Sequence, residues 1–270
     1  MFSLQIRLLL VAMRVWSRLP LSPRAVAMVA AHPQWHGRAV RYLPLVGAIV
    51  AALASVAYAL CGAWLPQAVA VLFALAAGLL LTGAMHELGF AAFCDGYGRQ
   101  APGARTAALL RESPAGGAAV GTLGVLALLL LVLLKFETLS SIDASWIALS
   151  LIGAAAFSRG CLVWVMAALA PVDSHGQAFP AGADRAVAYA LAVLPSLAAA
   201  AWTGNQSVFL TAMLLGFVAA QAVRHLVRRQ GAGASLAGLG AVQQVAELAY
   251  WIGVLATLTV VDEAATDTPS

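Results

Sequence analysis

Residues 82–98, TGAMHELGFAAFCDGYG, decide how the rest of this sequence is interpreted. A long apolar run comes directly before this stretch, and His86, Glu87 and Asp95 then follow within a few positions. A helix that faces lipid does not tolerate several ionisable side chains, so in a membrane protein such residues mark a candidate functional site. We therefore take residues 82–98 as the place where apolar chain meets polar chemistry.

The composition predicts a polytopic membrane protein. Of the 270 residues 62% are hydrophobic and only 10% are charged, whereas soluble domains carry about 25% charged residues. So few charges cannot cover a surface that faces water on all sides. The three cysteines, Cys61, Cys94 and Cys161, show no disulfide or metal-site spacing, and we interpret them as small apolar residues.

Residues 1–43 form a basic N-terminal segment that precedes the first long apolar run. The sequence LQIRLLLVAMRVWSRLP, residues 4–20, is typical of an amphipathic helix that lies at the membrane interface and ends at Pro20. Anchoring is the simple function for this segment. Its arginines also leave open a contribution to holding an anionic substrate.

Apolar runs long enough to cross a membrane follow this segment. They occupy residues 43–65, 67–85, 118–136, 145–170, 186–202, 207–223 and 241–260. We expect an all-α bundle of about seven transmembrane helices, forming one membrane domain over residues 44–260. Polar loops are expected at 86–117, 171–185 and 224–240, and residues 261–270 are expected to be a disordered tail.

The positions of the basic residues predict the orientation of the bundle. If residues 1–43 are cytoplasmic, thirteen of the fifteen Lys and Arg residues lie on the cytoplasmic side. The two others are Lys135, expected at the end of a span, and Arg159, within a span. The opposite side carries acidic residues without arginine. The polar stretch at 82–98 is therefore expected to face the cytoplasm.

The spacing of acids in residues 82–98 bears on metal binding. If the second span continues as a helix to residue 97, Glu87, Ala91 and Asp95 share one face, with Leu88 and Ala92 beside it. Carboxylates on such a stripe hold divalent cations, which neutralise phosphate oxygens in phosphoryl transfer. A second interpretation, an interfacial helix end with solvated acids, stays open at this point.

Arg159, in the segment FSRGC, lies within or at the end of an apolar run. A buried arginine needs a partner, and a phosphate, Glu87 or Asp95 would supply one. Alternatively, the helix ends near Arg159 and the guanidinium reaches the membrane surface.

Two glycine-rich segments and a glutamine pair complete the candidates. Arg111 and Ser113 precede PAGGAAVGTLG, and Arg228 and Arg229 precede GAGASLAGLG. Glycine-rich turns can bring backbone N–H groups to phosphate, but glycines in membrane helices more often serve packing. The basic pair is also the ordinary flank of a cytoplasmic loop. Glu247 follows Gln243 and Gln244, a pattern that fits hydrogen bonding between helices or the lining of a site.

These segments together resemble the cobalamin synthase family, the adenosylcobinamide-GDP ribazoletransferases. The similar segments are RLPLS, RYLPLVGAIV, LLLTGAMHELGFAAFCDGYG, LLRES, GTLGVLALLLLVLLKF, SRGCLVWVMAALAP and GLGAVQQVAELAY. They extend over nearly the whole chain. Their combination is far more specific than the apolar helices alone.

The resemblance implies a bacterial inner-membrane enzyme of late cobalamin biosynthesis. Such an enzyme joins adenosylcobinamide-GDP to alpha-ribazole or its 5′-phosphate and releases GMP, with Mg²⁺ as cofactor. It implies Glu87, Asp95 and Arg159 as catalytic residues, of which Glu87 and Asp95 hold the metal. The implied substrate-binding residues are His86, Arg111, Ser113, Arg228, Arg229, Gln244 and Glu247.

Three positions depart from the family pattern, which has an acid where this chain has Leu88, Ala92 and Ala237. The alternative to an active transferase is a diverged, non-catalytic homologue that binds a corrinoid intermediate or scaffolds enzymes of the pathway. The expected partners are the small-molecule substrates and the lipid bilayer, and no nucleic acid. Self-association and assembly with other cobalamin-pathway enzymes stay open.

Overall fold

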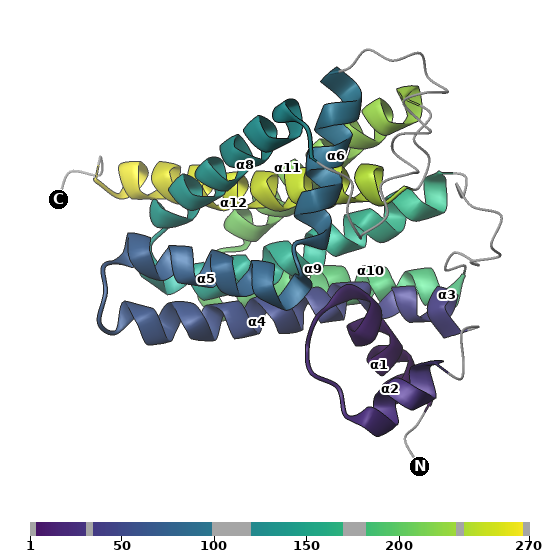
Figure 1. Ribbon diagram of the computed structural model, residues 1–270. Coiled ribbons are helices and arrows are strands. Elements are labelled where there is room, and N and C mark those ends of the chain that lie inside the picture. The colour runs from purple at the N-terminus through teal and green to yellow at the C-terminus, as the bar shows by residue number, and fades with distance from the viewer. Residues whose placement is uncertain (1–3, 31–34, 99–119, 170–181, 231–234, 267–270) are drawn as a thin grey trace.

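The computed structural model describes residues 4–30, 35–98, 120–169, 182–230 and 235–266 (Figure 1). These ranges contain helices and no strand, which confirms the all-α class. The helices are α1 (Leu4–Trp16), α2 (Pro23–Ala30), α3 (His36–Ala39), the 3-10 turn η2 (Val40–Tyr42), α4 (Leu43–Gly62), α5 (Gln67–Thr82), α6 (Met85–Gly98), α8 (Thr122–Ser140), α9 (Ala144–Ala168), α10 (Ala183–Thr203), α11 (Gln206–Arg229) and α12 (Leu236–Thr266).

Six helices in the described part of the chain are long and apolar enough to cross a membrane. The bent pair α5 and α6 makes a seventh span if its two members are counted together. This confirms the expected polytopic bundle. Several boundaries differ from the expected ones, since α3, η2 and α4 form one span from His36, and α12 continues to Thr266.

The second span does not continue straight through residues 82–98, so the condition under which Glu87 and Asp95 would extend that span is not met. Gly83 and Ala84 both have positive φ, 68° and 54°, and α6 leaves the axis of α5 at 89°. Glycine ends a helix readily in the left-handed conformation, because it has no Cβ to clash. Consequently α6 runs across the other helices of the bundle (Figure 1).

The chain after α1 covers this bend. The Arg18 backbone N–H donates to the Leu81 carbonyl at 2.7 Å, and the Arg18 side chain lies against Gly83, where a Cβ would collide with it. Arg41 attaches the same N-terminal region to α10, because its guanidinium pairs with Asp184 at 2.6 Å. The N-terminal helices are thus docked on one end of the bundle.

Glycines allow α6 and α12 to cross in close contact. A Cβ on Gly89 would lie 2.5 Å from the Leu236 carbonyl oxygen, and one on Gly240 would lie 2.6 Å from the His86 carbonyl oxygen. Small residues at such crossings let backbones approach within a membrane bundle. This crossing sets the register between Glu87 of α6 and the polar face of α12.

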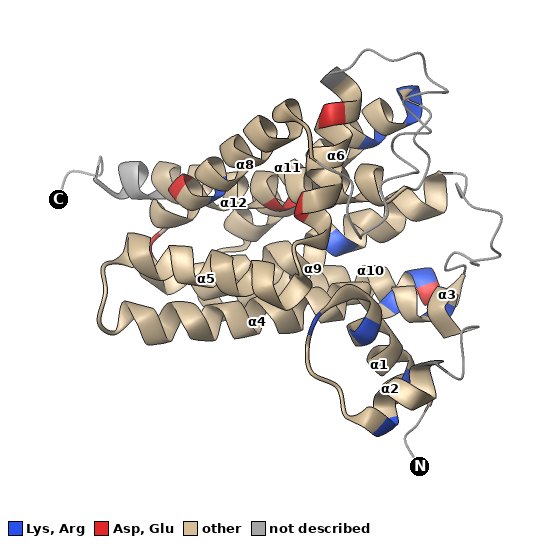
Figure 2. Ribbon diagram, in the orientation of Figure 1, with Lys and Arg blue, Asp and Glu red and all other residues tan. Residues whose placement is uncertain are grey.

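The charged residues divide between the two ends of the bundle and its interior (Figure 2). Arginines of α1, α2 and α3 and of the end of α11 lie at the end that also holds the beginning of α10. The opposite end carries the turns that join α4 to α5 and α10 to α11. This distribution agrees with the asymmetry that the sequence predicts.

Candidate functional site

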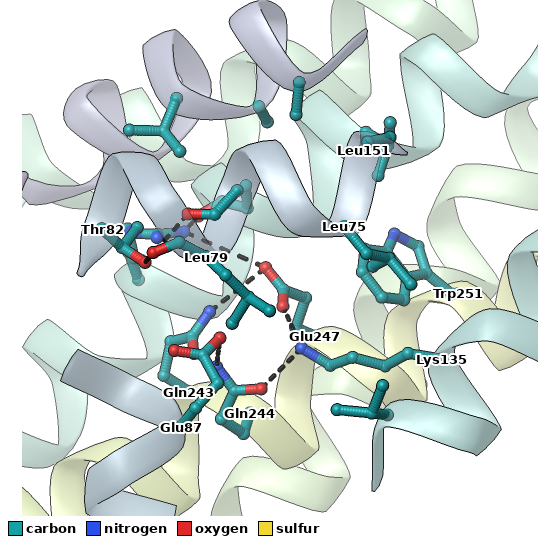
Figure 3. A pocket seen from close by; sticks show the side chains of 18 residues that line it. Leu75, Leu79, Thr82, Glu87, Lys135, Leu151, Gln243, Gln244, Glu247 and Trp251 are labelled. Carbon is teal, nitrogen blue, oxygen red and sulfur yellow. Dashed lines mark hydrogen bonds and ion pairs between the residues drawn. The ribbon is translucent and has the colours of Figure 1, made fainter. Parts of the chain in front are cut away.

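Polar side chains from four helices meet inside the bundle and line one side of a cavity of about 80 Å³ (Figure 3). They are Glu87 of α6, Lys135 of α8, Arg159 of α9, and Gln243, Gln244 and Glu247 of α12. We call these six residues the charge cluster. Apart from Thr82, the remaining wall of the cavity is apolar and comes largely from α4 and α5. The apolar wall keeps the charge cluster in a medium where unpaired charges are costly.

Glu247 lies at the centre of the charge cluster. Its Oε2 accepts from Lys135 Nζ at 2.6 Å, and its Oε1 accepts from Gln243 Nε2 at 3.2 Å. Arg159 Nη1 lies 4.0 Å from the same Oε1. Lys135 also lies over the Trp251 ring, with Nζ 5.3 Å from the ring centroid. Glu247 is therefore paired with two cations, as a carboxylate within an apolar bundle must be.

Gln244 connects this ion pair to Glu87. Its amide oxygen accepts from Lys135 Nζ at 2.5 Å, while its amide nitrogen donates to Glu87 Oε1 at 2.7 Å. The same nitrogen also donates to Gln243 Oε1 at 2.7 Å. Glu87 Oε2 is buried and has no hydrogen-bond partner among the described residues. One carboxylate oxygen of the charge cluster is thus left able to accept a hydrogen bond.

The charges in the cluster balance. Glu87 and Glu247 contribute two negative charges, and Lys135 and Arg159 contribute two positive charges. Each of the four side chains lines the same cavity. A neutral total lowers the free energy of burying these groups compared with any three of them.

Arg159 is an interior residue of α9, which continues to Ala168, so the interpretation that the helix ends at this arginine is wrong. Its side chain is 4% exposed, and Nη1 donates to the Ala155 carbonyl at 3.0 Å. Gly47 of α4 makes room for it, since a Cβ there would lie 2.5 Å from Arg159 Cδ. The acid beside Arg159 is Glu247, a partner that the sequence analysis did not name.

Asp95 has a different environment from Glu87. Its carboxylate accepts from the backbone N–H groups of Gly121 at 2.5 Å and Gly124 at 2.8 Å, so it caps the N-terminus of α8. Eight positions along α6 correspond to about 12 Å, which separates Asp95 from Glu87. The structure therefore does not bring the two predicted metal ligands together.

No set of three or more His, Cys, Asp or Glu side chains in the described ranges is close enough to hold a metal ion. The three positions where the resemblance implies an acid carry apolar side chains in this chain. Leu88 is 44% exposed, Ala92 packs against the apolar core, and Ala237 is buried. Their side chains add no oxygen ligand to the charge cluster.

The other predicted substrate-binding residues do not line the cavity or lie outside the described chain. His86 is buried, and neither ring nitrogen has a partner among the described residues. Arg228 and Arg229 are exposed in the last turn of α11 and do not line the cavity. Arg111 and Ser113 lie outside the described residues.

Lys135 is the member of the charge cluster that the sequence analysis missed. It is the single lysine of the chain, and we expected it at the end of a span. Instead it is 5% exposed and pairs with Glu247 inside the bundle. One sequence signal could have indicated this pair: Lys135 is a lone cation in one apolar run, and Glu247 is a lone acid in another.

The sequence of this chain is similar to those of known proteins. Residues 8–255 match the family described as cobalamin-5-phosphate synthase. A relative from Leptothrix cholodnii, named adenosylcobinamide-GDP ribazoletransferase, is 34% identical over 93% of this chain and 95% of its own length. A relative of the same name from Azorhizobium caulinodans is 35% identical over 90% of this chain and 93% of its own length. No solved structure matches the chain.

Proposed function

This chain belongs to the cobalamin-5-phosphate synthase family, and on that basis we propose that it is an adenosylcobinamide-GDP ribazoletransferase. It joins adenosylcobinamide-GDP to alpha-ribazole or its 5′-phosphate and releases GMP. The observation that carries the proposal is the charge cluster, which lies within the matched residues and brings two cations and a carboxylate, one oxygen of which has no partner among the described residues, to one cavity.

The proposed reaction is an attack by a ribazole hydroxyl on the cobinamide-side phosphorus of the diphosphate. A new O–P bond forms, the bond from that phosphorus to the oxygen of GMP breaks, and GMP leaves with the bonding electron pair. We assign Glu87 as the acceptor of the hydroxyl proton, because its Oε2 is buried and has no partner among the described residues. General base catalysis of this kind contributes about 10²–10⁴ in rate.

Arg159 is the proposed stabiliser of negative charge on the phosphates. Its Nε is buried without a partner among the described residues, and its side chain lines the cavity. A fixed guanidinium in an apolar surrounding stabilises developing phosphate charge more strongly than it does in water. Lys135 is less suited to this task, since its ammonium is already bound to Glu247 and Gln244.

Mg²⁺ is the cofactor implied by the family resemblance, and it remains part of the proposal. When bound to a diphosphate, such an ion neutralises its oxygens. The described residues do not fit a site held by the protein, because Glu87 and Asp95 are separated and Lys135 and Arg159 already balance the acids. We therefore assign no ligands and no reaction step to the metal.

We also propose that the bundle lies in the bacterial inner membrane with its basic end in the cytoplasm. The positive-inside rule and the arginines of α1, α2, α3 and the end of α11 support this orientation. An alkaline phosphatase fused after residue 266 should be active in the periplasm, since α12 ends on the opposite side. A fusion that is active only when placed at the N-terminus would reverse the orientation.

The direct test measures GMP. Purified protein in detergent, given adenosylcobinamide-GDP and alpha-ribazole with and without Mg²⁺, should release GMP that chromatography detects. Arg159→Met should lower kcat about 100-fold or more, and Arg159→Lys should retain more of the rate because it keeps the charge. No GMP from this chain, under conditions in which the Leptothrix cholodnii relative releases it, would overturn the proposal.

A further inference from the structure

Lys135 makes two hydrogen bonds that are expected to have different consequences. The bond to Glu247 Oε2 balances a buried charge, while the bond to Gln244 Oε1 fixes a neutral amide. Gln244 in turn donates to Glu87 Oε1 from the other end of its amide group. Lys135, Gln244 and Glu87 therefore form a continuous chain of hydrogen bonds from α8 through α12 to α6 (Figure 3).

The ammonium helps to determine which way the Gln244 amide points, together with the two acceptors of its nitrogen, Glu87 Oε1 and Gln243 Oε1. A lysine can only donate hydrogen bonds and an ionised carboxylate can only accept them, so the amide must turn its oxygen to Lys135 and its nitrogen to Glu87. In the opposite orientation the amide nitrogen would face position 135. Without the ammonium this orientation becomes possible, because the nitrogen would no longer face a group that can only donate. That orientation places the amide oxygen against the Glu87 carboxylate, where the two acceptors repel each other.

We propose that Lys135 is a positioning residue that acts through Gln244 to hold Glu87 Oε1, so that Glu87 Oε2 stays free to accept a substrate hydroxyl. This inference rests on the proposed function, in which that hydroxyl is the nucleophile. The ligand class is a hydroxyl donor, and the proton it loses passes to Glu87 as the new O–P bond forms. Lys135 itself contacts neither the hydroxyl nor the phosphorus.

A double variant separates this role from simple charge balance. Lys135→Met leaves Glu247 without its closest cation, so Tm should fall by more than about 5 °C. Lys135→Met combined with Glu247→Gln removes one charge of each sign and should bring Tm back to within about 2 °C of the wild type. Its kcat should stay at least about tenfold below that of the wild type, because the proton acceptor is misplaced. Its KM should stay within about twofold of the wild-type value, because substrate binding is unchanged.

Gln244→Met gives an independent measurement, because it keeps the ion pair between Lys135 and Glu247. It should lower kcat about as much as the double variant does. Ser158→Ala is the matched control: Ser158 accepts from Gln243 at 3.3 Å but lies outside the three-residue chain, so its kcat should match the wild type. Recovery of both Tm and kcat in the double variant, or full kcat in Gln244→Met, would overturn the positioning role.

A spectroscopic readout keeps this test separate from the test of the proposed function. The carboxylate stretch of Glu87 can be isolated as the infrared difference between wild type and Glu87→Gln, without substrate. This band should shift when the same difference is recorded in the Lys135→Met and Glu247→Gln background, since the Gln244 amide that binds the carboxylate loses the ammonium that anchors its oxygen. An unchanged band overturns the inference even if the enzyme releases GMP, whereas absent GMP with a shifted band overturns only the proposed function.

Discussion

The two ends of α6 carry the same functional group in different roles. Near its beginning, Glu87 accepts one hydrogen bond from Gln244 and leaves its other oxygen unpartnered among the described residues. Near its end, Asp95 uses both oxygens to accept backbone N–H groups of Gly121 and Gly124. Glu87 can therefore still accept a hydrogen bond from a ligand, whereas both oxygens of Asp95 are engaged in capping α8.

The difference shows that the role of an acidic residue in a motif depends on which helix its side chain meets. Glu87 lies beside α12, whose side chains offer amides and charges, because Gly89 and Gly240 let the two helices touch. Asp95 lies beside the first turn of α8, whose free N–H groups attract a carboxylate. Substitutions near the two ends of α6 test whether chemistry and stability divide between them in this way.

Glu87→Gln should produce the largest effect. It removes the proposed proton acceptor but keeps the shape of the side chain, so kcat for GMP release should fall about 10²–10⁴-fold. Steady-state kinetics measures this loss, and Asp95→Asn is the control on the same helix, expected to retain most of the rate. If Asp95→Asn lost as much activity as Glu87→Gln, the division between the two ends would be wrong.

Gly240→Ala should disturb the register between α6 and α12. The added Cβ would lie 2.6 Å from the His86 carbonyl oxygen, so the helices must separate at a free-energy cost of about 1–3 kcal/mol. Thermal unfolding in detergent measures the loss, and kcat should fall with it because Glu87 moves from Gln244. Gly62→Ala is a suitable control, since a Cβ there would meet only the Ala70 Cβ at 3.7 Å and Gly62 does not line the cavity.

Asp95→Ala should lower stability by about 1–2 kcal/mol, because two N–H groups at the start of α8 lose their acceptor. Hydrogen exchange should accelerate in the first turn of α8 and stay unchanged in α12. Loss of GMP release without loss of stability would instead support a catalytic role for this carboxylate.

Asp143→Ala should have the smallest effect, and it should depend on pH. Asp143 is an exposed cap of α9, and hydrogen bonds from the Ser145 hydroxyl and backbone N–H lower the pKa of its carboxyl group. Because this pKa is lower in the folded state, the stabilisation is present above the unfolded pKa of about 3.9 and is lost as the pH falls through the folded pKa. The difference in Tm from wild type should therefore disappear towards acidic pH. A difference that grew on acidification would contradict this assignment.

Local pattern predicted the architecture well, and it singled out several polar residues that the structure brings together. Apolar runs gave the spans, and the motifs gave the family, which the match over residues 8–255 confirms. Glu87, Arg159, Gln244 and Glu247 were all singled out, and the structure brings these four to one cavity. Their roles in the reaction remain predictions.

The partners of these residues were not predictable from local pattern. The bend at Gly83 and Ala84 depends on positive φ at two residues, and apolar periodicity on either side of it does not reveal it. Lys135 was placed at a span end because hydropathy does not say which way a helix faces. Asp95 was grouped with Glu87 because the two share a helix, although α8 supplies its partners.

The sequence by itself thus determined that this protein is a helical membrane bundle, and which polar residues interrupt its apolar runs, since both follow from composition along a single helix. Only the tertiary structure decided that Lys135 meets Glu247, that Gln244 reaches Glu87 and that Asp95 caps α8. The physical reason is that a charge buried among apolar side chains must find a partner, but any of several helices can provide one. Close crossings at glycines and the sharp bend before α6 select which helix does so.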